Sequence, residues 1–230
     1  MLGFRSYLFT FAKYKIRNLH KDEKENDFFQ FLELLKCSEG NILDIGANLG
    51  IMTVHLAQAF PDATVHAFEP IPDNCHVFKQ VIEKYKLKNV VFHEVALGEE
   101  NGTAEMILPR NRGTKLQGLS HVKHNSITEW NDGEVFEVEM KRLDDMDIGK
   151  VCGIKMDVEN FEYFVLKGGI ELLKRDSPII YTELWKNGNR TKCFELLEEL
   201  GYKPHVVQKG HLAVYDQRLS KAQNFIFIHF

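Results

Sequence analysis

The stretch Leu43-Asp-Ile-Gly-Ala-Asn-Leu-Gly50 decides the fold of this 230-residue chain. An apolar run before it predicts a buried strand over 41–46, and a helix is predicted over 50–60, where Pro61 ends it. In doubly wound sheets, nucleotide ligands lie at this first strand-to-helix turn, and glycines there let a ligand approach the backbone. The glycines here are spaced Gly-x-x-x-Gly, which differs from the Gly-x-Gly-x-x-Gly spacing of dinucleotide sites.

Strands and helices alternate along most of the chain. Strands are predicted over 64–69, 89–97, 153–158 and 178–183, and helices over 28–35, 72–86, 161–173 and 191–200. Two extended pieces, 205–215 and 224–229, end the chain. The alternation predicts a doubly wound α/β fold with a mostly parallel sheet, right-handed crossovers and an antiparallel C-terminal edge.

Length and composition predict one main domain. The chain is 44% hydrophobic, so it has the material for a real core, and about 200 residues suffice for one sheet domain of this kind. We predict a basic and aromatic entry segment over 1–26 and a single domain over 27–230, with a polar insertion at about 111–132. The entry segment predicts a helix packed on the domain, with contact to a membrane surface as the alternative. Both extra pieces are expected to govern substrate choice.

Charge and cysteine spacing exclude several classes. A net charge of −4 is unfavourable for a general nucleic-acid binder, and no run approaches the ~18 apolar residues of a membrane span. The entry segment lacks the features of a secretory signal. Cys37, Cys75, Cys152 and Cys193 show no metal-type spacing. We interpreted them as reduced, mostly buried thiols of a cytoplasmic protein. The oligomeric state is not predicted.

Two acids point to the cofactor. Asp44 precedes the first glycine, where a carboxylate would repel a pyrophosphate and attract the ammonium or sulfonium of S-adenosylmethionine. Glu69 ends the second strand and is expected to accept hydrogen bonds from both ribose hydroxyls, an arrangement that nicotinamide cofactors share. The predicted cofactor is S-adenosylmethionine. Its predicted contacts are Asp44, Gly46, Ala47, Asn48, Gly50, Glu69, Pro70, Ala96 and Leu97, the last two with core packing as the alternative.

A second cluster, Lys155-Met-Asp-Val-Glu-Asn-Phe-Glu162, marks the expected reaction centre. Asp157 should lie at the carboxyl end of its strand, level with the reactive methyl, and Glu183 ends the next strand. We predict three catalytic residues: Asp157 as base or acceptor-positioning group, and Glu159 and Glu183 as acceptor contacts. The predicted substrate contacts are Glu162, His121 and His124.

Blander interpretations remain for these residues. The alternative role of Asp157, Glu159 and Glu162 is helix capping, because negative charge is stabilised at a helix N-terminus. Histidines three residues apart are often surface residues, and Lys155 pairs with one of the acids in the simplest case. No firm set of metal ligands can be identified, so no metal is predicted, with a divalent cation that acidifies the acceptor hydroxyl as the alternative.

Six motifs together resemble the FkbM family of methyltransferases. They are Leu43 to Gly50, Phe68-Glu-Pro70, Val95-Ala-Leu-Gly98, Lys141-Arg-Leu-Asp144, Lys155-Met-Asp-Val-Glu159 and Asn224-Phe-Ile-Phe-Ile228, in the family's order over roughly residues 28 to 229. The resemblance implies a seven-stranded, Rossmann-like class I methyltransferase fold. It also implies O-methylation of a hydroxyl on a sugar, glycolipid or small natural product. Asn160 stands where the family has glycine; asparagine tolerates left-handed backbone angles, so the turn is expected to survive while the acceptor pocket differs.

Two other functions stay open at this point. One is a nicotinamide-dependent oxidoreductase on a similar sheet, against which Asp44 and the glycine spacing argue. The other is a non-catalytic binding module, which Asn160 favours. The expected partner is a small-molecule, glycan or glycolipid acceptor, with no nucleic acid.

Overall fold

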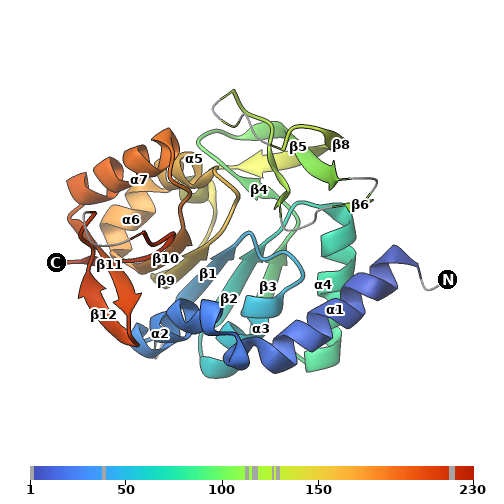
Figure 1. Ribbon diagram of the computed structural model, residues 1–230, viewed down its shortest axis with the longest axis horizontal. Coiled ribbons are helices and arrows are strands. Elements are labelled where there is room, and N and C mark those ends of the chain that lie inside the picture. Colours follow the sequence, from blue (N-terminus) through green and yellow to red (C-terminus); the bar gives the residue numbers. More distant parts are fainter. Residues whose placement is uncertain are drawn as a thin grey trace.

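The computed structural model describes residues 3–37, 40–111, 114–115, 119–125, 127, 130–217 and 221–230 (Figure 1). Its main sheet has eight strands in the order β12-β11-β13-β10-β9-β1-β2-β3. Their bounds are β1 Asn41–Ile45, β2 Thr64–Phe68, β3 Val90–His93, β9 Val151–Met156, β10 Ile179–Glu183, β11 Tyr202–Gln208, β12 His211–Val214 and β13 Asn224–His229. The helices are α1 Phe4–Asn18, α2 Asn26–Leu34, α3 Ile51–Ala59, α4 Pro72–Tyr85, α5 Glu162–Lys167, α6 Ile170–Asp176 and α7 Gly188–Glu199.

Helices cover both faces of this sheet, as the doubly wound prediction requires (Figure 1). Apolar side chains of α1 to α4 pack with one face of the sheet, and those of α5 to α7 pack with the other. Strands β10, β9, β1, β2 and β3 run parallel, so their carboxyl ends meet at one edge. This edge is where ligands of open α/β sheets bind.

The antiparallel C-terminal edge is confirmed, with one strand more than expected. β13 pairs antiparallel with β10 and with β11, and β11 pairs antiparallel with β12. The stretch 205–215, predicted as one extended piece, is a hairpin that turns at Lys209 and Gly210. Their φ angles of 51° and 78° match a two-residue turn in which both residues are left-handed. The turn makes the sheet eight-stranded instead of seven-stranded.

A second sheet occupies the middle of the chain, where the sequence also predicts strands over 103–108 and 134–142. Its order is β4-β8-β5-β6, with β7 paired to β5; the bounds are β4 Ala96–Leu97, β5 Gly102–Asn111, β6 Thr114–Lys115, β7 His121–Val122 and β8 Gly133–Lys141. The predicted strand over 89–97 is therefore split, because β4 leaves β3 and pairs with β8. The polar insertion at about 111–132, for which the sequence suggests a long loop or short helix, contains the short strands β6 and β7.

The predicted helix over 161–173 is divided into α5 and α6. Gly168 and Gly169 lie between them, and a Cβ atom on Gly168 would overlap the carbonyl oxygen of Gly98. The chain needs glycine at this point because the second sheet approaches it closely.

The cysteine prediction is wrong for two of the four residues. Cys37 and Cys152 form a disulfide across a sequence separation of 115, whereas Cys75 and Cys193 are free and buried as expected. The segment that leaves α2 passes β9, which brings the two Cα atoms to 5.9 Å, within the normal range for a disulfide. The cytoplasmic location rested on four reduced thiols, so it stays a prediction without that support.

The entry segment forms α1, which lies across α3 and α4. Leu8, Ala12 and Ile16 are its buried side chains and join one apolar cluster with side chains of those two helices. Among the residues described, no helix combines the length and the apolar character needed to span a membrane.

Candidate functional site

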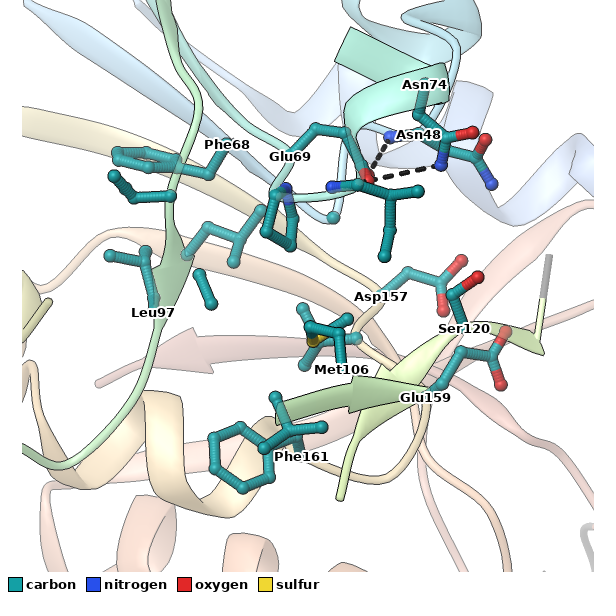
Figure 2. A pocket seen from close by; sticks show the side chains of 18 residues that line it. Asn48, Phe68, Glu69, Asn74, Leu97, Met106, Ser120, Asp157, Glu159 and Phe161 are labelled. Atoms are coloured by element: carbon teal, nitrogen blue, oxygen red, sulfur yellow. Dashed lines mark hydrogen bonds between the residues drawn. The ribbon is translucent and has the colours of Figure 1, made fainter. Parts of the chain in front are cut away.

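A first cavity, of about 70 Å³, opens at the carboxyl ends of β1, β2 and β9 (Figure 2). Eight residues predicted from the sequence line it: Gly46, Asn48, Glu69, Pro70, Ala96, Leu97, Asp157 and Glu159. The parallel register explains why they meet, because Ile45 at the end of β1 lies beside Phe68 of β2 and Met156 of β9. The loops that follow these strands therefore start at the same height on the sheet.

Glu69 is the central polar group of this cavity. It is 5% exposed, and its carboxylate accepts hydrogen bonds from the backbone N–H of Asn48 (2.9 Å), the backbone N–H of Ile71 (2.9 Å) and the Asn74 side-chain amide (3.1 Å). Burial raises the pKa of Glu69 to about 7, although these three donors oppose the shift. The donors fix the carboxylate toward the cavity.

Two further oxygens beside Glu69 lack partners. Asn48 Oδ1 and Asn74 Oδ1 are buried and accept no hydrogen bond within the described chain, and both residues line the first cavity next to Glu69 (Figure 2). A buried acceptor without a donor costs about 1–3 kcal/mol. The group at this end of the cavity thus consists of acceptors, which fits a ligand that brings several donors, such as the two hydroxyls of a ribose.

Asp44 lies behind the glycine turn and does not line the cavity among the described residues. Its carboxylate is fully buried; one oxygen accepts a hydrogen bond from Thr53 Oγ1 (2.5 Å), and the other lies 3.1 Å from Lys155 Nζ. Lys155 also donates to the carbonyl oxygen of Gly46 (2.9 Å). Asp44 is therefore linked to the turn through Lys155 and to α3 through Thr53.

The two motif glycines lie in close contact with other parts of the protein, where a larger residue would not fit. Gly46 and Gly50 have φ angles of 76° and 78°, in the left-handed region. A Cβ atom on Gly46 would overlap the backbone carbonyl oxygen of Asp157, and one on Gly50 would overlap the ring of Phe78. These contacts give both glycines a packing reason in addition to the predicted approach of a ligand, and the Gly46 contact couples the turn to the end of β9.

Asp157 and Glu159 form the acidic side of the first cavity. Figure 2 shows both side chains together with Ser120, across the cavity from Glu69. Burial raises the pKa of Asp157, with Lys155 opposing and Asp44 adding to the shift. Burial, followed by the charges of Asp157 and Glu183, raises the pKa of Glu159 to about 9. A cation at this side would relieve the repulsion between these acids.

Glu183 is not among the residues that line the first cavity, but its charge interacts with those of Asp157 and Glu159. It ends β10 and is partly buried, and burial, Asp157 and Glu25 raise its pKa. No group of three or more His, Cys, Asp or Glu side chains is placed to hold a metal ion within the part of the chain that the structure describes.

Asn160 keeps the turn, as predicted. Glu159 and Asn160 both have positive φ angles, 51° and 73°. The Asn160 side-chain oxygen accepts a hydrogen bond from the Asn187 amide (2.5 Å), and its backbone carbonyl accepts one from Asn189 (2.9 Å). Asn187 in turn caps α7 by accepting from the backbone N–H groups of residues 189 and 190. Asparagine thus ties the turn to α7, a bond that glycine cannot make.

The three tentative substrate contacts lie elsewhere. Glu162 is 3% exposed and accepts the backbone N–H of Val158 (3.2 Å), in the loop before α5; it is also the acid in the first turn of that helix, where negative charge is stabilised. His121 is buried between the Leu119 carbonyl oxygen (2.9 Å) and Asn131 Oδ1 (3.0 Å). The His124 ring packs on Phe161 and Phe164. None of the three lines the first cavity in the described part of the chain.

A second cavity, of about 620 Å³, lies between α1 and the turn after β1. Its lining includes Gly46, Asn48 and Asp157, which also line the first cavity, so the two cavities meet at these residues. Ala47 lines the second cavity, and Gly50 lines neither among the described residues. Asp157 thus lies at the junction.

Several lining residues were missed from the sequence. Asn74 follows Pro72 on the first turn of α4 and was identifiable as a polar residue close to Glu69. Met106, Ser120 and Val122 come from the second sheet and the insertion. No local sequence pattern predicts that these segments reach the first cavity. Glu25, in the second cavity, stands in a charged stretch that looks like ordinary surface in the sequence.

The chain belongs to the methyltransferase FkbM domain family, whose model matches residues 44–204. A doubly wound sheet with a site at its carboxyl edge and this family membership define a methyltransferase. The membership gives no support to the oxidoreductase alternative.

Two curated relatives are methyltransferases from fungi. Methyltransferase 1 of Beauveria bassiana (strain ARSEF 2860) is 27% identical over 183 residues, 72% of each chain. Methyltransferase sdnD of Sordaria araneosa is 24% identical over 188 residues, 70% of this chain and 73% of the relative. Both alignments cover most of the sheet domain.

Solved structures agree in fold. The methyltransferase FkbM of Methylobacillus flagellatus KT matches with a TM-score of 0.57 and 15% identity, over 86% of this chain and 45% of that one. This chain therefore spans less than half of that protein. A Streptococcus mutans protein assigned as a methyltransferase, solved in complex with SAH (S-adenosylhomocysteine), matches with a TM-score of 0.51 and 11% identity, over 90% of this chain and 95% of that one.

Proposed function

We propose that this methyltransferase uses S-adenosylmethionine and transfers its methyl group to an acceptor hydroxyl. One observation carries the proposal: a buried acceptor group (Glu69, Asn48, Asn74) and an acidic side (Asp157, Glu159) share one cavity. The first suits a ribose and the second suits a cation. S-adenosylmethionine has both and carries no phosphate, whereas the pyrophosphate of a dinucleotide would be repelled by the acids. The SAH complex of the Streptococcus mutans protein supports the choice.

The residues of this chain fit the cofactor as holders of its two ends. Glu69 with the two asparagine oxygens would accept from the ribose, and Ala96 and Leu97 give an apolar wall at the same cavity. Asp157 and Glu159 would face the sulfonium end. When bound, the cofactor supplies a methyl group on a positively charged sulfur.

Asp157 is the group placed to act on the acceptor. It lies where the two cavities meet, so a hydroxyl that enters from the second cavity reaches it beside the cofactor site. Asp157 would accept the proton of the acceptor hydroxyl as that hydroxyl oxygen takes up the methyl group. Burial raises the pKa of Asp157, while the charge of Lys155 opposes the rise, so its carboxylate binds a proton more firmly than an exposed aspartate does.

Thermal shift measurements test the cofactor. At 100 times its dissociation constant, SAH should stabilise the protein by about 2.7 kcal/mol, and NAD(H) should have no effect. Stabilisation by NAD(H) alone would overturn the cofactor assignment.

Turnover with methyl-labelled S-adenosylmethionine tests the chemistry. Asp157→Asn should retain SAH affinity and lose turnover on a panel of hydroxylated acceptors. Turnover that survives this substitution would refute the role of Asp157, and turnover lost in chelator would establish the metal-assisted version. A wild-type protein that binds SAH and methylates no acceptor would point to the binding module.

A further inference from the structure

One face of α1 is aromatic and lines the second cavity. Phe4, Tyr7 and Phe11, which we call the aromatic stripe, recur at three- and four-residue spacing, as one helix face requires. Their exposed fractions are 37%, 62% and 41%. The rings of Tyr7 and Phe11 are stacked, with centroids 6.5 Å apart. Contiguous exposed aromatic side chains beside a cavity are typical of a binding surface.

Other elements add apolar side chains to the lining of the second cavity. Leu49, Ile51 and Met52 line it from the turn after β1 and the start of α3, and Leu119 lines it from the insertion. The predicted substrate-determining pieces, the entry segment and the insertion, therefore both reach this cavity.

The charged groups of this cavity argue against an anionic ligand. Lys15 Nζ lies 2.9 Å from the carboxylate of Asp22, and Lys155 Nζ lies 3.1 Å from that of Asp44. The lining acids are Glu25 and Asp157. Because both lining lysines are held by carboxylates, a phosphate or carboxylate ligand would meet net negative charge here.

The second cavity is lined differently where it meets the first cavity and along α1. At its inner end Asp157, Asn48 and Gly46 belong to both cavities, and the aromatic stripe belongs to the second cavity only. A molecule bound in the second cavity can thus place one end at the junction while the rest of the molecule lies along α1. The volume of about 620 Å³ falls in the range of ligand sites.

We propose that the acceptor is an uncharged amphipathic small molecule, whose hydroxyl lies at Asp157 and whose apolar body lies in the second cavity against the aromatic stripe. The inference rests on the proposed function, because it takes the junction as the place of methyl transfer. It narrows the acceptor to molecules that bring an apolar body to the stripe, and away from anionic metabolites.

Calorimetric titration of the SAH-saturated protein with 1-hexanol, 1-octanol and 1-decanol tests the proposal. Each buried CH2 group is worth about 0.8 kcal/mol, so affinity should rise about fourfold per added methylene. Tyr7→Ala and Phe11→Ala should weaken 1-decanol binding at least about tenfold. Tyr14→Ala is the matched control, because Tyr14 is 64% exposed on the same helix and is not part of the cavity lining.

The outcomes separate this inference from the proposed function. If SAH does not bind the wild-type protein, the proposed function fails first. If SAH binds but alkanol affinity is independent of chain length, or falls equally in Phe11→Ala and Tyr14→Ala, the acceptor inference alone is refuted. A third outcome also refutes the acceptor inference: the protein binds no alkanol but co-sediments with phosphatidylcholine–phosphatidylserine vesicles, and Phe11→Ala and Tyr14→Ala reduce this binding equally. That result would assign the aromatic face to a membrane surface.

Discussion

Replacing Lys155 by methionine removes the buried charge beneath the glycine turn while preserving most of the side-chain volume. Lys155 is 4% exposed, and its ammonium lies 3.1 Å from the Asp44 carboxylate and 2.9 Å from the Gly46 carbonyl oxygen. Burial opposes the charge of Lys155, but Asp44 and Asp157 outweigh it and raise the pKa of this lysine. The charged form of Lys155 is therefore stabilised by its acidic neighbours.

The magnitude follows from the burial of both partners. The two side chains are 5% and 0% exposed, so methionine would leave the Asp44 carboxylate buried and without its cation. Losing one partner of such a pair costs about 3–5 kcal/mol. A domain typically has about 5–15 kcal/mol of unfolding free energy, so the variant should fold but unfold at much lower urea.

Urea unfolding followed by circular dichroism, in a double-mutant cycle, is the appropriate assay. Asp44→Asn combined with Lys155→Met removes both charges and leaves Thr53 a partner, so the double variant should be more stable than the sum of the single losses predicts, by at least about 2 kcal/mol. If Lys155→Met costs less than about 1 kcal/mol, or if the two losses are additive, the structural role of this pair is wrong.

Three further changes have defined outcomes. Gly46→Ala should lower the unfolding free energy by more than about 2 kcal/mol and abolish SAH binding, because the new Cβ atom would both strain a left-handed backbone and overlap the Asp157 carbonyl oxygen. Gly210→Ala, at a similar φ but with open space around it, should cost only about 1 kcal/mol. Equal urea midpoints for the two variants would contradict this reasoning. SAH affinity should fall about tenfold from pH 8 to pH 6, because protonation of Glu69, whose pKa is about 7, weakens an acceptor of ribose hydroxyls; calorimetry of Glu69→Gln should show a flat profile, and an unchanged slope would exclude Glu69 as its source. Cys37→Ser should lower the unfolding free energy by about 4–5 kcal/mol, as the loop of 115 residues implies; the difference should vanish in reductant, and its persistence there would assign the loss to packing.

The sequence predicts this fold well where the signal is local. The strand, turn and helix around Leu43 to Gly50 follow from apolar runs and glycines, and the positions of Glu69 and Asp157 follow from the rule that parallel strands end at one edge. The positive φ of Asn160 also follows from the chemistry of one residue. These features depend on neighbours within a few positions.

What the sequence misses depends on distant partners. Asp44 was expected to face the ligand, but Lys155 from β9 and Thr53 from α3 hold its carboxylate inside. Cys37 and Cys152 meet only because the path from α2 passes β9. A helix was predicted in the entry segment, yet which of its faces stays open is decided by α3 and α4.

The disulfide closes a covalent ring within the chain. Because Cys37 precedes β1 and Cys152 belongs to β9, the ring encloses the first three strands of the main sheet, the whole second sheet and the insertion. A protease that cuts the chain once inside the ring, for example in the insertion, therefore yields two peptides that remain one molecule until the disulfide is reduced. The insertion can be severed without separating Glu69 from Asp157, so its contribution to acceptor choice is open to measurement in a cleaved but still joined protein.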